Sequence, residues 1–564
     1  MALLDEYIVG VDGPWSDEEA AHLWRRAGFG ATPSERTTAV GAGDQVAFQA
    51  AVDALVNTQP QDPYLDQPAG TGTGAIGDPL ADLPNDTSDL GLVKTPISKR
   101  SMQAHWIYRM RYTSQPLQEQ LTLFLHDHMV SEWVKVTSGI TSQVNQGNDG
   151  VPPPTGFQSC TTGTLPYDPL RRTLFAIDLL MTQNYLFRAT GIDDFRQLLI
   201  NITRDPCMLL YLDNVLNRKG RAQENYAREV MELFSMGVGN YSENDVQEVA
   251  KCFTGETLPL RGCSNDYQYD VYGFDPALHE PGNKTVFGQT ITFDGTGQET
   301  VDVIDKILAK VSVNPDVSGL TPPYNTLPAA AVYMAWKLLQ WFVGRDFQLS
   351  PTPDLAVLEL ADYMRGTDAG VYPQRRYPYD VRAVLRKLFL SKLFVDSAYR
   401  YNLVKTPADY VVMALRMIGI GEGFAQFNGP ADRMADMGMS LFEPPNVAGW
   451  NHGNTWITSG NVIQRFNYAN RIGQAVLNGT AGDAWLDNLL TTNGWLPADP
   501  ADHPAIIDYF ATRLIQIPLT LEEQTALTAF LDTYPLVGSG NEPMRNKIRG
   551  IIHMLMAMPR FQLK

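Results

Sequence analysis

Cysteine is scarce in this sequence, and the few cysteines are scattered. Cys160, Cys207, Cys252 and Cys263 are the four present in 564 residues, and no two of them form a Cys-x-x-Cys pair. This spacing excludes a disulfide framework and argues against a thiolate zinc site or an attached c-type haem. We therefore expect free buried thiols, with a Cys252–Cys263 bridge as the alternative if the protein is exported.

Positive charge and long apolar runs are also in short supply. The chain has 44 basic and 62 acidic residues, a formal net charge of −18. A phosphate backbone is repelled on average, so nucleic acid is not an expected partner. The best apolar run, residues 329–343, is interrupted by Lys337 and Gln340, and it is too short to form a transmembrane segment. Residues 1–6 start acidic without an apolar segment, so no secretory signal is predicted. Export would therefore need another route.

The common catalytic signatures are missing as well. The sequence has no Gly-x-Ser-x-Gly elbow, no Walker loop, no Gly-x-Gly-x-x-Gly after a predicted strand and no His-Glu-x-x-His. Nucleotide-dependent chemistry and the common hydrolase folds are therefore disfavoured.

Helical periodicity is what the sequence has in abundance. It covers residues 16–27, 101–112, 117–130, 168–186, 192–202, 297–311, 328–343, 380–395, 460–477 and 545–558. Thr406-Pro407 and Thr520-Leu521-Glu522-Glu523 are typical helix starts. We predict a mostly α, large multi-helix globular fold with long loops.

The chain is expected to form one helical unit over residues 1–564 with two local features. Residues 285–293 alternate around a two-residue turn that begins at Gly288, which predicts a small β-hairpin insertion within residues 264–296. Residues 480–564 are a candidate C-terminal helical subdomain. Long loops over residues 58–95, 138–166 and 311–328 are either disordered or surfaces for a protein or polysaccharide partner.

One predicted helix, residues 223–234, has two chemically different sides. Ala227, Val230, Met231 and Phe234 make an apolar stripe, and Asn225, Arg228, Glu229 and Glu232 make a polar one beside it. The polar stripe is a solvated face with Glu224–Arg228 and Arg228–Glu232 pairs, or it is partly buried and supplies carboxylates to an acid/base or metal centre.

Three further segments carry groups that take part in chemistry. His126 and His128 are two residues apart, and on a continuous helix their side chains point about 200° apart, so joint metal ligation requires the helix to end or bend there. The turn from His279 to Lys284 is either a structural turn or a contributor to the same centre. Residues 450–456, with a tryptophan at each end, are an anchored loop or an aromatic binding rim.

Several short motifs give the chain a resemblance to one bacterial family. They are residues 23–30 (LWRRAGFG), 123–129 (LFLHDHM), 209–214 (LLYLDN), 223–234 (QENYAREVMELF), 279–284 (HEPGNK), 444–450 (PPNVAGW) and 558–564 (MPRFQLK). Together they resemble the motifs of the DUF1800 family nearly from end to end. The family has no agreed reaction. Its members often occur in exported settings near sulfatase-like proteins, so the resemblance points to an extracellular polymer as substrate.

The leading functional hypothesis is a metal-dependent enzyme, hydrolytic rather than redox because no haem, flavin or thiolate signature exists. The expected catalytic residues are Arg228, Glu229, Glu232, His279 and Lys284. The expected ligands of a divalent metal are His126, His128, Glu229 and His279. The alternative is a non-catalytic surface, assembly or binding protein whose paired buried charges set helix packing and whose long loops bind a partner.

Overall fold

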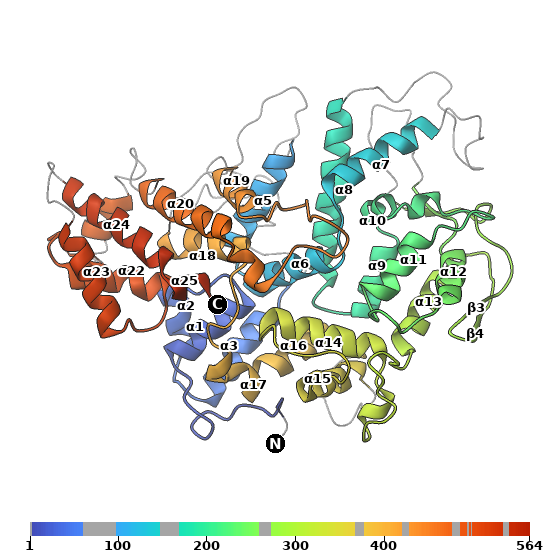
Figure 1. Ribbon diagram of the computed structural model, residues 1–564, viewed down its shortest axis with the longest axis horizontal. Coiled ribbons are helices and arrows are strands. Elements are labelled where there is room, and N and C mark those ends of the chain that lie inside the picture. The colour runs from blue at the N-terminus through green and yellow to red at the C-terminus, as the bar shows by residue number, and fades with distance from the viewer. Residues whose placement is uncertain are drawn as a thin grey trace.

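The computed structural model describes residues 3–59, 98–146, 169–258, 272–366, 377–419, 428–475, 485–492, 496–497, 499–533 and 541–564. Helices dominate these ranges, and the described strands form two small antiparallel pairs (Figure 1). The mostly α prediction is confirmed. None of the described helices is long and apolar enough to cross a membrane.

The first part of the chain builds the centre and one end of the molecule. Its helices are α1 (Asp17–Ala27), α2 (Pro33–Val40), α3 (Gln45–Val56), α5 (Lys99–Tyr112), α6 (Pro116–His128), α7 (Trp133–Gln146), α8 (Pro169–Thr190), α9 (Phe195–Thr203), α10 (Pro206–Tyr211), α11 (Glu224–Glu232) and α12 (Glu243–Cys252). The strands that follow are β1 (Glu256–Thr257), β2 (Gly273–Phe274), β3 (Lys284–Val286) and β4 (Gln289–Ile291).

The second part covers the centre and forms the opposite end. Its helices are α13 (Gln298–Ala309), α14 (Ala329–Phe342), α15 (Leu355–Arg365), α16 (Val381–Phe389), α17 (Lys392–Val395), α18 (Pro407–Ile418), α19 (Asn428–Asp436), α20 (Ser459–Ala475), α22 (His503–Leu514), α23 (Leu521–Thr533), α24 (Glu542–Ala557) and α25 (Pro559–Gln562).

The helix starts follow local sequence chemistry. Thr406 caps α18 by accepting the N–H of Asp409, whose carboxylate in turn accepts the Thr406 N–H, and Pro407 supplies the first turn. Thr520 and Glu523 make the same reciprocal pair at α23. Each such cap satisfies backbone donors that the first turn of a helix leaves unpaired. Both predicted starts are confirmed.

The predicted hairpin is present, with a different turn. Val286 pairs with Gln289, so the two turn residues are Phe287 and Gly288, with φ of 51° and 71°. The expectation that Gly288 begins the turn was wrong. The Phe287 N–H donates to Asp245 of α12 at 2.7 Å, which holds this aromatic residue in the left-handed region. A tertiary contact therefore decides the turn.

The three predicted loops differ in outcome. Residues 60–97 and 147–168 lie outside the described residues. Residues 133–146 are helical as α7, so a loop does not begin at 138. Residues 311–328 have little regular structure apart from one short 3₁₀ turn, Tyr324–Thr326. Cys252 is a free buried thiol, whereas Cys263 lies outside the described residues.

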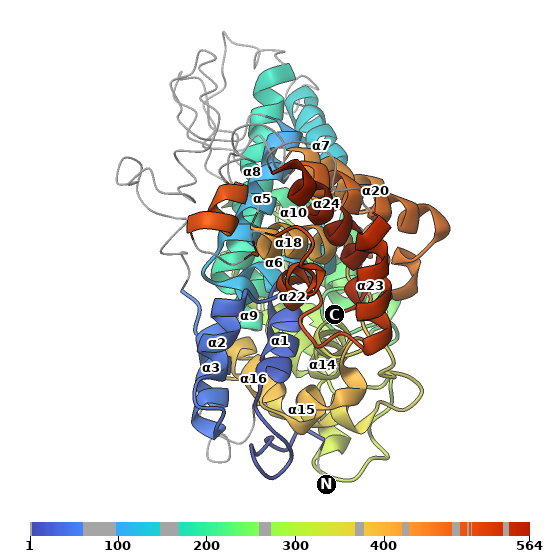
Figure 2. The same ribbon diagram turned by 90° about the vertical axis from the view of Figure 1, so that its left-hand side faces the viewer.

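Segments far apart in sequence pack together around α6. In Figure 1 the helices α22 to α24 lie at one end of the molecule, the β3–β4 hairpin lies at the other, and α6 lies between them. The C-terminal helix α24 packs on α20, and α22 packs on α18. Near the N-terminus α3 packs on α16, and Figure 2 shows these two helices at the same lower side of the molecule.

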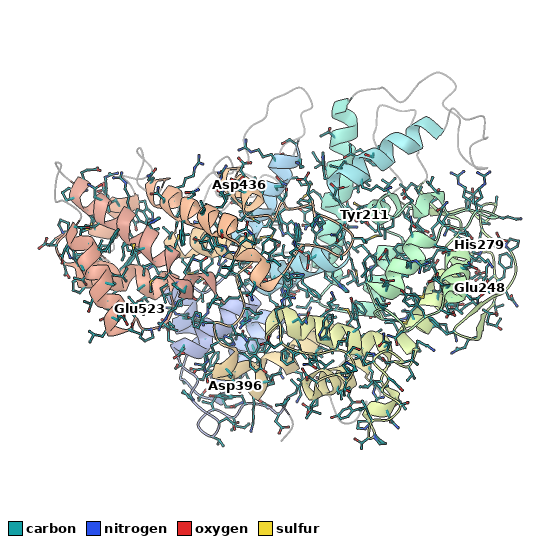
Figure 3. The ribbon with its side chains drawn as sticks, viewed as in Figure 1. Tyr211, Glu248, His279, Asp396, Asp436 and Glu523 are labelled. Carbon is teal, nitrogen blue, oxygen red and sulfur yellow. The ribbon has the colours of Figure 1, made fainter. Side chains whose placement is uncertain are left out.

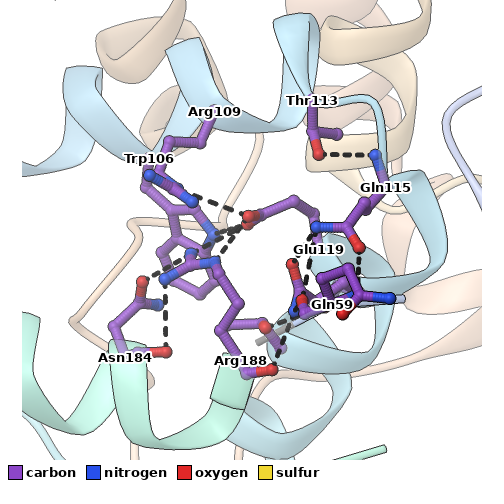
Figure 4. Close-up of polar contacts among 10 residues, drawn as sticks. Gln59, Trp106, Arg109, Thr113, Gln115, Glu119, Asn184 and Arg188 are labelled. Atoms are coloured by element: carbon purple, nitrogen blue, oxygen red, sulfur yellow. Dashed lines mark hydrogen bonds and ion pairs between the residues drawn. The ribbon is translucent and has the colours of Figure 1, made fainter. Parts of the chain in front are cut away.

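A buried ion-pair cluster joins α5, α6 and α8 (Figure 4). The carboxylate of Glu119 is fully buried and accepts from Arg188 at 2.6 and 2.9 Å and from Trp106 Nε1 at 3.0 Å. Arg109 adds a longer contact of 3.4 Å. The arginines hold the pKa of Glu119 below its usual value despite the opposing effect of burial. This carboxylate holds three helices in register.

Candidate active site

A small charged cavity lies where the C-terminal end of α6 meets α14 and the loop after Pro444. Its volume is about 60 Å³, enough for a few water molecules or one small polar group of a ligand. Helix α6 contributes Phe124, Asp127 and His128, and Leu233 lies just beyond α11. Tyr333, Lys337, Trp341 and Arg345 come from α14 and the residues after it, and Val447, Ala448 and His452 come from the loop. Four elements thus converge on one partly enclosed space.

A carboxylate–imidazole pair forms one wall of the cavity. Asp127 accepts the backbone N–H of Trp450 at 2.7 Å, and its second oxygen lies 2.9 Å from Nε2 of His452. A charged carboxylate requires a proton on that nitrogen, which leaves Nδ1 of His452 as the proton acceptor. Nδ1 is buried and has no hydrogen-bond partner among the described residues. This is the orientation in which a carboxylate prepares an imidazole to act as a general base.

Gly449 makes this approach of loop and helix feasible. Its φ is +87°, in the left-handed region that favours glycine. A Cβ at this position would lie 2.4 Å from both the carbonyl oxygen and a carboxylate oxygen of Asp127. The glycine of the 444–450 motif therefore lets the loop backbone reach Asp127.

Two cations also line the cavity. The ammonium of Lys337 lies 5.4 Å from the ring centres of both Tyr333 and Trp336. The side chains of Lys337 and Arg345 form no ion pair or hydrogen bond with any part of the chain that the structure describes. Burial lowers the pKa of Lys337 and lowers the pKa of Arg345 to about 10, with Asp127 opposing both shifts.

The two predicted metal-binding histidines lie in different surroundings, as the helical geometry requires. His128 lines the cavity, stacks on Phe124, and has Nε2 3.0 Å from the carbonyl oxygen of Phe234, to which it donates. Burial and then Lys337 lower the pKa of His128 to about 3. It is therefore a neutral wall of the cavity whose Nε2 is already engaged.

His126 lies outside the cavity in an aromatic cage. The rings of Trp106, Phe442 and Trp450 have centres 5.4, 5.2 and 5.6 Å from its imidazole. Burial lowers the pKa of His126 to about 4, and Nε2 has no partner among the described residues. Its surroundings are those of an apolar core rather than of a metal centre.

The polar stripe of α11 is a surface network. Arg228 pairs with Glu243 at 2.7 and 2.9 Å and more loosely with Glu224 at 3.4 Å. The expected Arg228–Glu232 pair was wrong, because Glu232 instead accepts the hydroxyl of Tyr241. Burial and then Glu232 raise the pKa of the half-buried Glu229. These residues lie near the cavity through Leu233 but do not line it.

His279 and Lys284 form a separate buried cluster with Glu299 of α13. Lys284 Nζ lies 2.8 Å from one oxygen of Glu299, and His279 Nε2 lies 3.3 Å from the other. His279 Nδ1 donates to the carbonyl of Thr254 at 2.7 Å. Figure 3 places His279 near the hairpin end of the molecule, away from α6 in the same view. The cluster ties the hairpin to α13.

A family model described as "Protein of unknown function (DUF1800)" matches residues 22–147 and 175–563. The chain belongs to the DUF1800 family. The predicted resemblance is therefore confirmed over most of the sequence. No curated protein and no solved structure matches the chain.

Within the described ranges of this DUF1800 protein, the predicted ligands do not come together as a metal centre. Among the residues that the structure describes, no group of three or more His, Cys, Asp or Glu side chains is arranged to hold a metal ion. The predicted ligands lie apart: His126 in its cage, His128 at the cavity, Glu229 on α11 and His279 beside Glu299. This donor set does not fit a shared ion.

Features of the DUF1800 sequence point to the cavity residues, although the prediction did not assign these residues to the site. Lys337 interrupts the apolar run 329–343, and Asp127 lies between the two motif histidines. His452 follows the 444–450 motif by two residues. At the other cluster, Glu299 shares a helix face with Val303 and Ile307 at i, i+4 and i+8, which is a sign of a buried carboxylate.

A more open hollow lies next to the cavity, on the same loop. It has a volume of about 500 Å³, and Pro444, Pro445 and Asn446 line it just before the loop reaches the cavity at Val447. Tyr211 and Glu132 also line it, and burial and then Glu132 raise the pKa of Tyr211 to about 12. This hollow has room for a ligand portion that the cavity lacks.

Proposed function

We propose that this protein is a hydrolytic enzyme whose active site is the cavity at the end of α6. The single observation that carries the proposal is the Asp127–His452 pair, 2.9 Å apart, in a cavity that is also lined by two cations without ion-pair partners among the described residues. Proton-transfer groups and fixed charge in an enclosed space are the ingredients of acid/base catalysis.

The pair supports water activation by the chain's own side chains. Asp127 fixes the tautomer and orientation of the His452 ring, and Nδ1 accepts a proton from a water molecule admitted to the cavity. The water oxygen then attacks the bond to be cleaved, and the imidazolium returns its proton to the leaving group. Asp127 stabilises the imidazolium through the same contact.

The cavity takes only the reacting portion of a substrate. The neighbouring hollow of about 500 Å³ can hold a sugar or peptide unit that continues from it. This arrangement is compatible with an extracellular polymer, which the resemblance to the family suggests. The polymer is therefore the proposed substrate class.

The test is hydrolysis of a substrate panel by wild type and paired variants. Nitrophenyl esters, glycosides, phosphates and sulfates are assayed together with sulfated and unsulfated polysaccharides. Asp127→Asn and His452→Gln should each lower turnover by about 100-fold or more while leaving the fold intact. Asp305→Asn is the matched control, because that carboxylate pairs with Arg196 on the surface. Variants that turn over substrate at the wild-type rate refute the assignment.

A metal requirement is a separate proposal with its own measurement. Elemental analysis of protein purified without chelator should find a stoichiometric divalent ion if one is needed. Addition of chelator should then abolish turnover. The residues that the structure describes supply no ligand set for that ion, so a positive result would assign the ligands elsewhere in the chain.

The non-catalytic alternative also has an observation in its favour. The buried clusters at Glu119 and Glu299 fix helix packing rather than face a cavity. A protein in which all buried charges are structural would bind a partner without changing it. Wild type that turns over no member of the panel favours this alternative.

A further inference from the structure

The cavity is positively charged inside a strongly acidic protein. Lys337 and Arg345 face one carboxylate, Asp127, whereas the chain as a whole has a net charge of −18. His128 adds no positive charge near neutral pH, because its pKa lies at about 3. The local excess of positive charge therefore comes from these two side chains.

The carboxylate of Asp127 forms no ion pair with either cation. One of its oxygens accepts from Trp450 N–H and the other from His452. Lys337 contacts aromatic rings, and Arg345 has no ion pair within the described part of the chain. Both side chains are partly buried, and a cation that is partly removed from water is stabilised by an acidic partner. Their state points to a missing anionic partner.

Three side chains that can only donate hydrogen bonds line this space. The ammonium of Lys337 and the guanidinium of Arg345 can only donate, and so can the indole Nε1 of Trp341. That Nε1 is buried and has no partner among the described residues. A ligand that complements the three groups has several acceptor oxygens on one atom or one planar unit.

The next potential cation is already neutralised. Lys564 Nζ lies 5.7 Å from the centre of the Trp341 ring, but it pairs with Asp409 at 2.7 Å. Lys135, which lines the neighbouring hollow, pairs with Asp213 at 2.9 Å. Lys337 and Arg345 therefore differ from the lysines around them in lacking an acidic partner.

We propose that the cavity binds an oxyanionic group, a carboxylate, phosphate or sulfate, between Lys337 and Arg345. The inference that this group belongs to the substrate rests on the proposed hydrolytic function; the binding of the anion itself does not. The volume of about 60 Å³ suits one such group rather than a whole substrate. Held there, the group lies beside Asp127 and His452.

Isothermal titration calorimetry tests the proposal with the full chain and three inorganic or simple salts. Sodium phosphate, sodium sulfate and sodium acetate are titrated at constant ionic strength, and their relative Kd values identify the preferred oxyanion. At least one should bind saturably with one site per chain. Lys337→Met and Arg345→Met should each raise that Kd by about tenfold or more, because a charge-assisted contact is lost.

Matched variants separate the site from general charge effects. Lys251→Met removes a lysine of α12 that pairs with Glu248 and lines neither the cavity nor the hollow, so it should leave the Kd unchanged. Lys337→Arg keeps the charge and should retain binding, which guards against loss of fold in the Met variant; circular dichroism checks each protein. Wild type that binds none of the three salts, or Met variants with the wild-type Kd, overturn the proposal.

Asp127→Asn distinguishes this proposal from the proposed function. Removing the competing negative charge should strengthen anion binding while it abolishes turnover. Retained binding in a wild type that turns over nothing would leave the anion site standing and remove the enzyme. Turnover in a wild type that binds none of the three salts would support the enzyme and refute the anion site.

Discussion

His126 should make the protein sensitive to acid without any metal being involved. Its folded-state pKa of about 4 lies below the ordinary histidine value because the Trp106, Phe442 and Trp450 cage removes it from water. As pH falls, the unfolded chain takes up the proton first. The stability that His126 contributes is therefore complete above about pH 6.5 and is lost as pH falls toward 4.

The size of this effect follows from the shift. One pKa unit corresponds to about 1.4 kcal/mol, so the full pKa shift of His126 contributes about 3 kcal/mol to the free energy of unfolding. About 2 kcal/mol of it is lost between pH 7 and pH 4.5. His126→Phe keeps an aromatic ring of similar size in the cage and removes the titrating group. The variant should lose about 2 kcal/mol less stability than wild type between these two pH values.

Urea denaturation followed by tryptophan fluorescence at pH 7 and pH 4.5 measures the difference. His553→Phe serves as the control, because that histidine is only half-buried and has no such cage, so its effect should be smaller. If wild type and His126→Phe lose the same free energy of unfolding over this interval, His126 is not a buried neutral histidine with a lowered pKa.

Two substitutions compare an exposed ion pair with a buried one, both measured as free energies of unfolding. Arg228→Ala should cost about 0–1 kcal/mol, because its pair with Glu243 is exposed to solvent; a cost above about 3 kcal/mol would show that the stripe on α11 is buried in solution. Glu119→Gln should cost about 3–5 kcal/mol, because it leaves Arg188 and Arg109 beside a neutral amide with no solvent access; an unchanged midpoint would mean that the cluster is not what joins α5, α6 and α8.

Local sequence chemistry determined where the helices lie. The reciprocal caps at Thr406 and Thr520 depend on residues three positions apart, so the sequence contains all of their partners. The 3.6-residue periodicity likewise predicts which face of α11 is buried, and Ala227 and Val230 are buried as expected. It also predicted that His126 and His128 face different ways, which the structure confirms.

Contacts between distant segments decided what that local chemistry could not. The α11 stripe contained all the charges of a potential site, yet Glu243 of α12 neutralises Arg228 and the face stays on the surface. The hairpin turn was placed one residue off because Asp245, from α12, fixes Phe287. In both places a partner outside the element overrode the pattern within it.

The cavity is the clearest case. Asp127 and the loop N–H that fixes it are 323 residues apart in the chain, and the carboxylate receives its imidazole from the same distant loop. In the sequence alone, Lys337 is a polar residue that interrupts an apolar helix. Only packing of α14 against α6 and the 444–453 loop turns it into a cation that faces a cavity without a partner. Periodicity and capping act over a few residues, so the sequence determined the helices, and tertiary packing decided which charges remained unpaired.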